Sequence, residues 1–224
     1  MHKLDANEYT FEDVKGSTTT YFVKREWNKN VYGLEGIEFS PGDIVLDIGG
    51  HVGVISTLLG KLHPSINIIS YEASPAHAEL FKKNLKTNKV DNVSVNCAAV
   101  EGHSGETVTL SYCGEGNSGN MSKFHKTDTS LFCSSISISF DDIIKKHGIE
   151  KIKFLKVDCE GSEYEIFYAS KYFRPEFVEY VAIEFHNRRE LQEMGFSPEK
   201  LYQDMLDLWG DKLIVANNVN QCWI

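Results

Sequence analysis

The sequence predicts a single α/β domain built around a twisted, mostly parallel β-sheet. From residue 43 onward, short β-branched runs alternate with segments of helical periodicity, which is the pattern of repeated βαβ units. A glycine-rich turn at 47–53 joins the first expected strand to the first expected helix, the place where doubly wound sheets bind ligands. The chain has 224 residues, of which 42% are hydrophobic, and this suffices for one core without disulfide or metal support.

The order of the apolar runs places each element along the chain. Pro75 occupies the first helical position after the second strand, where its fixed φ angle and missing N–H are tolerated. We expect an added β segment at 106–112, and an antiparallel pair at 212–218 and 219–224 that closes a seven-stranded sheet. The core strands are expected at 44–48, 67–72, 93–98, 153–158 and 180–185, and the helices at 52–62, at 75–88, from about 162, and at 198–209.

Two segments interrupt this alternation. Residues 1–35 are predicted to form an N-terminal extension of strands and turns that packs on the main domain at 36–224. The stretch 113–130 is rich in Gly, Ser and Asn and exceeds the usual length of a loop without secondary structure. Because Met121 and Phe124 would be wasted in a plain linker, we weigh a lid over an active site equally against a neutral insertion.

Charge and composition argue against several classes of protein. The formal net charge of −9 disfavours nucleic acid as a substrate, because affinity for phosphate backbones comes mainly from Lys and Arg. Asp47 and His51 interrupt the longest apolar stretch, and the polar start MHKLDANEYT lacks the apolar centre of a signal peptide. The five cysteines form no C-x-x-C pair, which favours a reducing compartment. We therefore expect a cytoplasmic protein that binds neither nucleic acid nor membrane.

The glycine turn favours a nucleoside cofactor without a pyrophosphate. A dinucleotide fingerprint would need glycine at position 48, which is Ile48, and the Asp47 carboxylate would repel a pyrophosphate. The same carboxylate suits the cationic sulfonium and amino groups of S-adenosylmethionine. Glu72 ends the second strand, where a carboxylate accepts hydrogen bonds from both ribose hydroxyls, a contact that NAD would also use. A glycine turn that serves only packing is the alternative.

The segment DCEGSE at 158–163 ends the fourth core strand and opens a helix. Parallel strands place such polar groups at the carboxyl edge of the sheet, beside the cofactor cleft. We expect Asp158 to face the reacting centre, and Glu160 either to orient the turn or to contact the cofactor. Glu163 is weighed equally as a helix-capping residue and as a participant in the chemistry.

The fifth strand ends in a second polar group. Glu184 and His186 are two residues apart and therefore share one face of the strand. A histidine beside a carboxylate is suited to act as a general base on an alcohol, which is the role we expect for His186. The alternative is a divalent metal held by Asp158, Glu184, His186 and Asn187, but we expect catalysis without a metal.

Several stretches together resemble the FkbM-type S-adenosylmethionine-dependent methyltransferases, from about Phe39 to His186. The resemblance implies a class I, Rossmann-like methyltransferase fold and O-methylation of a sugar, polyketide or other small hydroxylated molecule. One departure is that His51 stands where the family loop has Asn, and it is expected to replace that Asn as a donor to the methionine carboxylate. The similar stretches are PGDIVLDIGGHVGVIS, ISYEASPAHAELFKKNL, NVSVNCAAV, SFDDII, FLKVDCEGSEYEIF and VAIEFH.

The resulting prediction is an S-adenosylmethionine-dependent O-methyltransferase. Two alternatives stay open: an NAD-dependent oxidoreductase, and a nucleoside-binding module that lacks catalysis. Cofactor binding distinguishes them. The expected catalytic residues are Asp158, Glu184 and His186, and the expected cofactor contacts are Asp47, Gly49, Gly50, His51, Gly53, Glu72, Ala73, Ser74 and Asp158.

Overall fold

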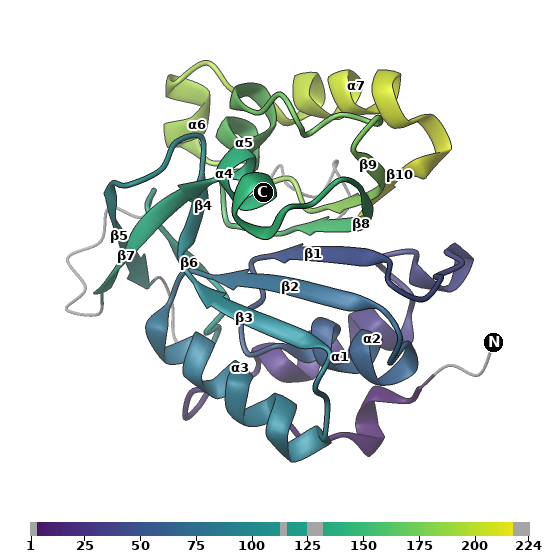
Figure 1. The fold of residues 1–224 in the computed structure, drawn as a ribbon. Coiled ribbons are helices and arrows are strands. Elements are labelled where there is room, and N and C mark those ends of the chain that lie inside the picture. Colours follow the sequence, from purple (N-terminus) through teal and green to yellow (C-terminus); the bar gives the residue numbers. More distant parts are fainter. Residues whose placement is uncertain (1–3, 113–115, 125–131, 217–224) are drawn as a thin grey trace.

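A six-stranded parallel sheet forms the centre of the protein (Figure 1). The computed structural model describes residues 4–112, 116–124 and 132–216. All neighbouring strands of this sheet run parallel, in the order β10-β9-β8-β1-β2-β3. The strands are β1 (Ile44–Ile48), β2 (Asn67–Glu72), β3 (Val93–Cys97), β8 (Ile152–Val157), β9 (Val178–Ile183) and β10 (Leu213–Val215).

Helices cover both faces of the sheet, because alternate strand residues are apolar on both sides. Along β1, Val45 packs in one apolar core with α1 and α2, whereas Leu46 and Ile48 pack in a second core with α4, α5 and α7. None of the helices in the described ranges has the length and apolar character needed to cross a bilayer. The helices are α1 (Thr19–Asn28), α2 (Val54–Leu62), α3 (Pro75–Asn88), α4 (Phe140–His147), α5 (Glu163–Ala169), α6 (Arg189–Glu193) and α7 (Pro198–Trp209), with 3₁₀ turns at Ala6–Glu8, Leu34–Gly36 and Gly210–Lys212.

A second, four-stranded sheet stands at the carboxyl end of β3. It begins there because only Ala98 separates β3 from β4. Within it, β4 and β7 are parallel, whereas β5 pairs antiparallel with both β7 and β6. The β segment expected at 106–112 is confirmed as β5, but the sequence did not predict the sheet around it. Its strands, in the spatial order β4-β7-β5-β6, are β4 (Ala99–Glu101), β7 (Phe132–Ser139), β5 (Thr107–Tyr112) and β6 (Met121–Ser122).

The α/β class and the parallel sheet are confirmed, and the described part of the main sheet has six strands rather than the expected seven. The last described strand, β10, pairs parallel with β9. The reason is that α7 is a crossover helix, which returns the chain to the sheet in its original direction. The other expected partner, 219–224, lies outside the described residues.

The expected strands in the N-terminal extension are also wrong, because residues 19–28 form helix α1. The β-branched and aromatic residues of TTTYFV favour a strand locally. Trp27 overrides this preference: it is 5% exposed, and its side chain packs in the core shared with α2. Tertiary packing therefore decides the conformation of this segment.

The stretch 113–130 is only partly a loop. Its ends at 113–115 and 125–130 lie outside the described residues. Between them, Met121 and Ser122 form strand β6. Phe124 is 9% exposed and belongs to the apolar core that also contains residues of α4, α5 and α7. This part of the stretch is therefore anchored in the fold.

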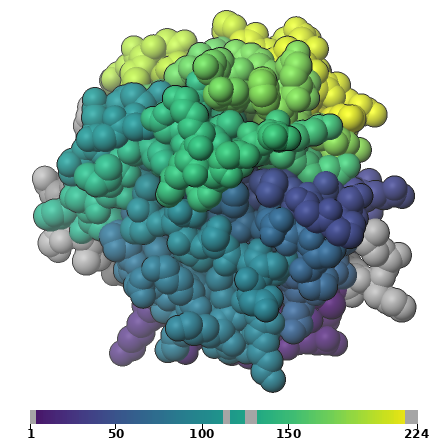
Figure 2. Space-filling model, in the orientation of Figure 1, coloured from purple at the N-terminus to yellow at the C-terminus, as the bar shows by residue number. Residues whose placement is uncertain are grey.

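The two halves of the chain meet along the middle of the main sheet. In the space-filling view the first half lies below and the second half above, and they join where β1 pairs with β8 (Figure 2). The carboxyl ends of these two strands therefore bring residues after 48 and after 157 to one place.

The glycine turn after β1 is closely packed by the protein itself. A Cβ atom at Gly53 would lie 2.0 Å from the ring of Phe81, and one at Gly49 would lie 1.7 Å from the carbonyl oxygen of Asp158. Both residues have positive φ angles, +85° and +80°, which glycine adopts without strain. The packing role that we weighed for this turn is therefore present.

We predict that Gly53→Ala lowers the free energy of unfolding by about 2–5 kcal/mol, from backbone strain and overpacking together. Gly105 is a matched control, since its φ is +90° and a Cβ atom added there would have no neighbour within 4 Å. Gly105→Ala should lower the same quantity by only about 1–2 kcal/mol. Urea denaturation measures both, and equal losses would contradict the packing role.

Candidate active site

A cavity of about 320 Å³ opens at the carboxyl ends of the parallel strands. Three parts of the chain form its walls: the turns after β1, β2, β8 and β9, helix α1, and the second sheet with the segment before β6. The lining includes Gly49, His51, Glu72 and Ala73, then Asp158, Glu160 and Glu184, then Thr19, Phe22 and Glu26, and finally Glu101, Leu110, Asn117, Gly119 and Met121.

The cavity wall is acidic. None of the described residues that line it is Lys or Arg. The carboxylates on the wall are those of Glu26, Glu72, Glu101, Asp158, Glu160 and Glu184. Lys123 and Arg188, which lie outside the lining, pair with Glu101 and Glu160. The acids on the wall still outnumber these cations, so the wall favours cations over anions.

Glu72 lies at the end of β2, where the sequence predicted it. Its Oε2 accepts a hydrogen bond from the backbone N–H of His51 at 2.7 Å, and its Oε1 accepts one from the backbone N–H of Ser74, also at 2.7 Å. The carboxylate thus joins the glycine turn to the start of α3 and still borders the cavity beside Ala73. Ser74 itself is buried and caps α3 through its hydroxyl.

Asp47 is not brought to the cavity. Its side chain is buried, where Oδ2 accepts hydrogen bonds from Ser56 at 2.5 Å and Ser70 at 3.1 Å. Its Oδ1 lies 3.2 Å from Nζ of Lys156, which also donates to the carbonyl oxygen of Gly49 at 2.9 Å. Burial alone would lower the pKa of Lys156, but the Asp47 and Asp158 carboxylates hold that pKa above its ordinary value. Asp47 therefore supports the glycine turn from inside the protein and does not line the cavity.

Gly50 and Gly53 likewise do not line the cavity. Cβ atoms there would meet Ser70 and Phe81 respectively, so both glycines face neighbouring protein. Of the three glycines expected to contact the cofactor, only Gly49 borders the cavity.

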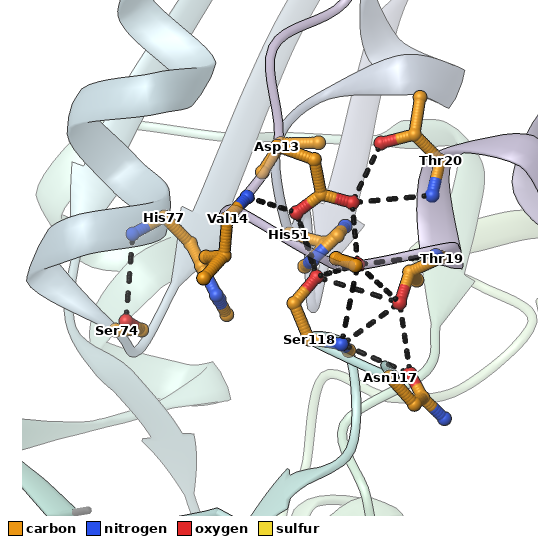
Figure 3. Close-up of polar contacts among 12 residues, drawn as sticks. Asp13, Val14, Thr19, Thr20, His51, Ser74, His77, Asn117 and Ser118 are labelled. Atoms are coloured by element: carbon orange, nitrogen blue, oxygen red, sulfur yellow. Dashed lines mark hydrogen bonds and ion pairs between the residues drawn. The ribbon is translucent and has the colours of Figure 1, made fainter. Parts of the chain in front are cut away.

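His51 is held by two segments that are distant in sequence (Figure 3). Its Nε2 lies 2.7 Å from Oγ of Ser118, whose hydroxyl is also 2.7 Å from Oδ1 of Asp13. Its ring also meets that of His77 edge-on, with centroids 4.7 Å apart. Asp13 further accepts hydrogen bonds from Thr20. The N-terminal segment around Asp13 and residues 116–119 are thus tied together over the glycine turn, and we call these two segments the cap.

These ties perturb the ionisation of the residues in the cap. Burial and the neighbouring His77 lower the pKa of His51 to about 4. Burial alone would raise the pKa of Asp13, but the hydrogen bond from Ser118 and the charge of His51 lower it to about 2. Sequence reasoning missed Asp13 and Ser118, because no local pattern links positions that are 105 residues apart.

Asp158, Glu184 and His186 are brought together as predicted from the ends of β8 and β9. Nε2 of His186 lies 3.9 Å from Asp158 Oδ1 and 4.0 Å from Glu184 Oε1. The same nitrogen lies 3.6 Å from Glu160, which pairs with Arg188. Asp158 and Glu184 line the cavity, and the His186 side chain, 12% exposed, lies behind them.

Glu163 does not cap α5 with its neighbour Ser162 as we considered. Ser162 makes no side-chain capping bond, and its hydroxyl donates to Glu101 at 3.0 Å. The fully buried Glu163 carboxylate instead accepts from the backbone N–H groups of Gly161 at 2.9 Å and His186 at 2.8 Å. It also lies 3.2 Å from Nδ1 of His186.

The packing of these acids shifts their ionisation. Burial and the Asp158 carboxylate raise the pKa of Glu184 to about 8. Burial raises the pKa of Asp158 more than the nearby Lys156 lowers it. Burial alone would lower the pKa of His186, but the carboxylates of Glu160 and Glu163 hold it well above its ordinary value.

We predict that His51 contributes a loss of stability between pH 7 and pH 5, because this side chain stays neutral when the protein is folded. The unfolded chain binds a proton at this side chain near pH 6.5, whereas the folded chain does so only near pH 4. The unfolded state is therefore favoured as the pH falls, and the loss should be about 2 kcal/mol in this window. Urea denaturation of wild type and His51→Asn at both pH values measures it.

The difference between the two proteins isolates this histidine from other titrating groups. On going from pH 7 to pH 5, the change in the free energy of unfolding should be about 2 kcal/mol less unfavourable in His51→Asn than in the wild type, because Asn does not titrate. The exposed His103 provides the control, and His103→Asn should keep the wild-type pH dependence. A His51→Asn protein with an unchanged pH dependence would contradict the prediction.

Comparison with known proteins identifies the family. A model of the methyltransferase FkbM domain matches residues 47–209. The 31-O-demethyl-FK506 methyltransferase FkbM of Streptomyces tacrolimicus is 20% identical over 185 residues, which cover 70% of each protein. The methyltransferase sdnD of Sordaria araneosa is 20% identical over 192 residues, or 73% of each.

A solved structure agrees at the level of the fold. The methyltransferase domain of METTL16 is 14% identical, with a TM-score of 0.51, over 88% of this chain and 64% of that one. The family match spans well over half of the chain and includes the glycine turn and the ends of β2, β8 and β9. The chain therefore belongs to the FkbM methyltransferase domain family, and it is an S-adenosylmethionine-dependent methyltransferase.

Proposed function

We propose that the protein methylates a hydroxyl group of a small, neutral or cationic molecule. The observation that carries this proposal is the acidic cavity wall, which has no Lys or Arg among its described residues and ends in Asp158 and Glu184. Phosphate-bearing acceptors, including nucleic acid, would be repelled there. The relative from Streptomyces tacrolimicus is named for methylation at an oxygen of FK506, which supports a small hydroxylated acceptor.

The residues of the cavity fit S-adenosylmethionine. Glu72 presents a carboxylate to the cavity at the end of β2, where ribose hydroxyls donate hydrogen bonds. Gly49 and Ala73 border the cavity and leave room for the nucleoside. The acidic wall suits the positive charges of the sulfonium and the amino group. Asp47, Gly50, Gly53 and Ser74 support this subsite from behind, through the contacts described above.

His51 takes a different part from the one expected. Its Nε2 is already engaged by Ser118, so we assign its side chain to holding the cap. Its backbone N–H donates to Glu72, which keeps that carboxylate oriented toward the cavity.

The chain's own residues have to orient the acceptor hydroxyl and remove its proton. Bound S-adenosylmethionine would supply an activated methyl group on its sulfonium, with the thioether sulfur keeping the electron pair of the carbon–sulfur bond. Asp158 and Glu184 lie on the cavity wall and are placed to hold the hydroxyl, with His186 behind them. The displaced hydroxyl proton leaves through this cluster to solvent.

We also propose that the protein works in the reducing cytoplasm. Cys97, Cys133 and Cys159 are free thiols in the described part of the chain. Free thiols persist where glutathione and thioredoxin keep cysteines reduced.

We predict that Glu72→Gln weakens binding of S-adenosylhomocysteine by roughly 10- to 150-fold, since hydrogen bonds to a charged group contribute about 1.5–3 kcal/mol. Each carboxylate oxygen already faces a backbone N–H, so an amide NH₂ would meet a donor on either side. Calorimetry measures the affinity. Glu79→Gln, on an exposed position of α3, is the matched control and should leave it unchanged. Equal affinities in wild type and Glu72→Gln would remove Glu72 from the cofactor site.

The proposed reaction is tested with methyl-deuterated S-adenosylmethionine and extracts of small metabolites. We predict that mass spectrometry finds the labelled methyl group on an oxygen of a small molecule. Asp158→Asn should lose this product while keeping affinity for S-adenosylhomocysteine within a few fold, because we assign Asp158 to the acceptor and Glu72, held by His51 and Ser74, to the ribose. A label found only on nitrogen, carbon or nucleic acid would contradict O-methylation of a small acceptor.

A further inference from the structure

Three side chains with metal-binding atoms converge where the cavity meets the ends of β8 and β9. One ligand atom from each of Asp158, Glu184 and His186 lies within 4.8 Å of the others. Oxygen and imidazole nitrogen are the donors preferred by Mn²⁺ and related divalent cations. We propose that these three side chains bind one divalent cation at the reacting end of the cavity.

The distances suit one shared ion. Ligands on an octahedral ion with bonds of about 2.1 Å stand about 3 Å apart when adjacent and about 4.2 Å apart when opposite. Nε2 of His186 lies 3.9 Å from Asp158 Oδ1 and 4.0 Å from Glu184 Oε1. All three ligand atoms lie within 4.8 Å of one another, so side-chain movements of roughly 1 Å would bring them onto one ion. Because Asp158 and Glu184 border the cavity, the remaining positions face water or the acceptor.

Glu163 provides an independent sign of a metal-binding histidine. Its fully buried carboxylate lies 3.2 Å from Nδ1 of His186 and accepts the backbone N–H of the same residue at 2.8 Å. A carboxylate on Nδ1 keeps the proton on that nitrogen and leaves the lone pair of Nε2 for an ion. Nε2 faces the carboxylates of Glu160, Asp158 and Glu184, at 3.6, 3.9 and 4.0 Å, so it lies among oxygen ligands. Glu163 is thus a positioning residue.

Several carboxylates lie close to Nε2 of His186. The carboxylates of Asp158, Glu160 and Glu184 all lie within 4.0 Å of it. Arg188 pairs with Glu160. Lys156 lies nearer to Asp47, at 3.2 Å, than to Asp158, at 3.7 Å. Carboxylate oxygens thus lie beside Nε2 at the cavity, and these are the ligands that divalent cations prefer together with imidazole nitrogen.

The role of the ion, unlike its binding, rests on the proposed function. A divalent cation beside the acceptor hydroxyl makes loss of the hydroxyl proton easier, so His186 acts as a ligand in place of the general base expected from the sequence. The proton then leaves to solvent.

The test is a titration of the full-length, chelator-treated protein with Mn²⁺, followed by electron paramagnetic resonance of the free ion. We expect one Mn²⁺ per chain in the wild type. Asp158→Asn and Glu184→Gln each remove a ligand and should weaken binding at least about tenfold, and Glu163→Gln should weaken it about 10- to 100-fold by releasing His186. Glu179→Gln, at the other end of β9, is the matched control and should bind as the wild type does.

Calorimetry measures the affinity of the same samples for S-adenosylhomocysteine. Normal affinity verifies that a variant is folded, and it distinguishes failure of the metal site from failure of the proposed function. Glu184 is 33% exposed, so Glu184→Gln is the variant best able to fold if Glu163→Gln does not. Equal, weak Mn²⁺ binding by wild type and the Asp158→Asn/Glu184→Gln double variant would overturn the metal site, and normal binding of S-adenosylhomocysteine would then leave the proposed function standing. A Mn²⁺ site without any methyl transfer to oxygen would instead overturn the proposed function alone.

Discussion

The buried ion pair between Asp47 on β1 and Lys156 on β8 fixes the geometry on which the rest of the site depends. The two residues are register partners on neighbouring strands, and both side chains are 4% exposed. Removing one partner of such a pair leaves a buried charge uncompensated, at a typical loss of about 3–5 kcal/mol. Lys156 also holds the carbonyl group of Gly49. The pair thus sets the glycine turn against the end of β8, and Gly49 and Asp158 reach the same cavity.

The acids of the site divide into two groups according to their partners. Glu163 receives backbone N–H groups and the imidazole, and Asp47 receives two hydroxyls and an ammonium group, so these carboxylates act as internal supports. Asp158 and Glu184 border the cavity, with side chains 25% and 33% exposed, and are accessible from it. Glu72 combines both roles, since it accepts two backbone N–H groups and still lines the cavity.

The sequence predicted the parts of the fold that local patterns specify. The buried strands at 44–48 and 67–72 and the helix at 198–209 are read from apolar runs bounded by Pro, Gly or Ser, and they are confirmed. The convergence of Asp158, Glu184 and His186 also followed, because parallel strands end at one edge. These predictions required no knowledge of distant contacts.

The sequence failed where tertiary packing decides the outcome. The sheet formed by β4 to β7 depends on pairing across an insertion, and its strand β7 is rich in Ser rather than in apolar residues. Asp47 has the residue type of a ligand contact, and only its burial against Lys156 assigns it to the interior. Ser118 meets His51 only because the insertion folds back onto the N-terminal segment. The assignments of individual residues to cofactor and acceptor stay predictions.

Backbone strain connects these observations. Four non-glycine residues of the described chain have positive φ, and two of them, His51 and Glu160, lie at the cavity. Such conformations persist only where the surroundings hold them. His51 is held by Glu72 at its backbone and by Ser118 at its side chain, and Glu160 is held by Arg188. Each strained turn directly follows a strand of the main sheet, β1 or β8, so the same ties that stabilise the backbone also aim the polar groups of the site into the cavity.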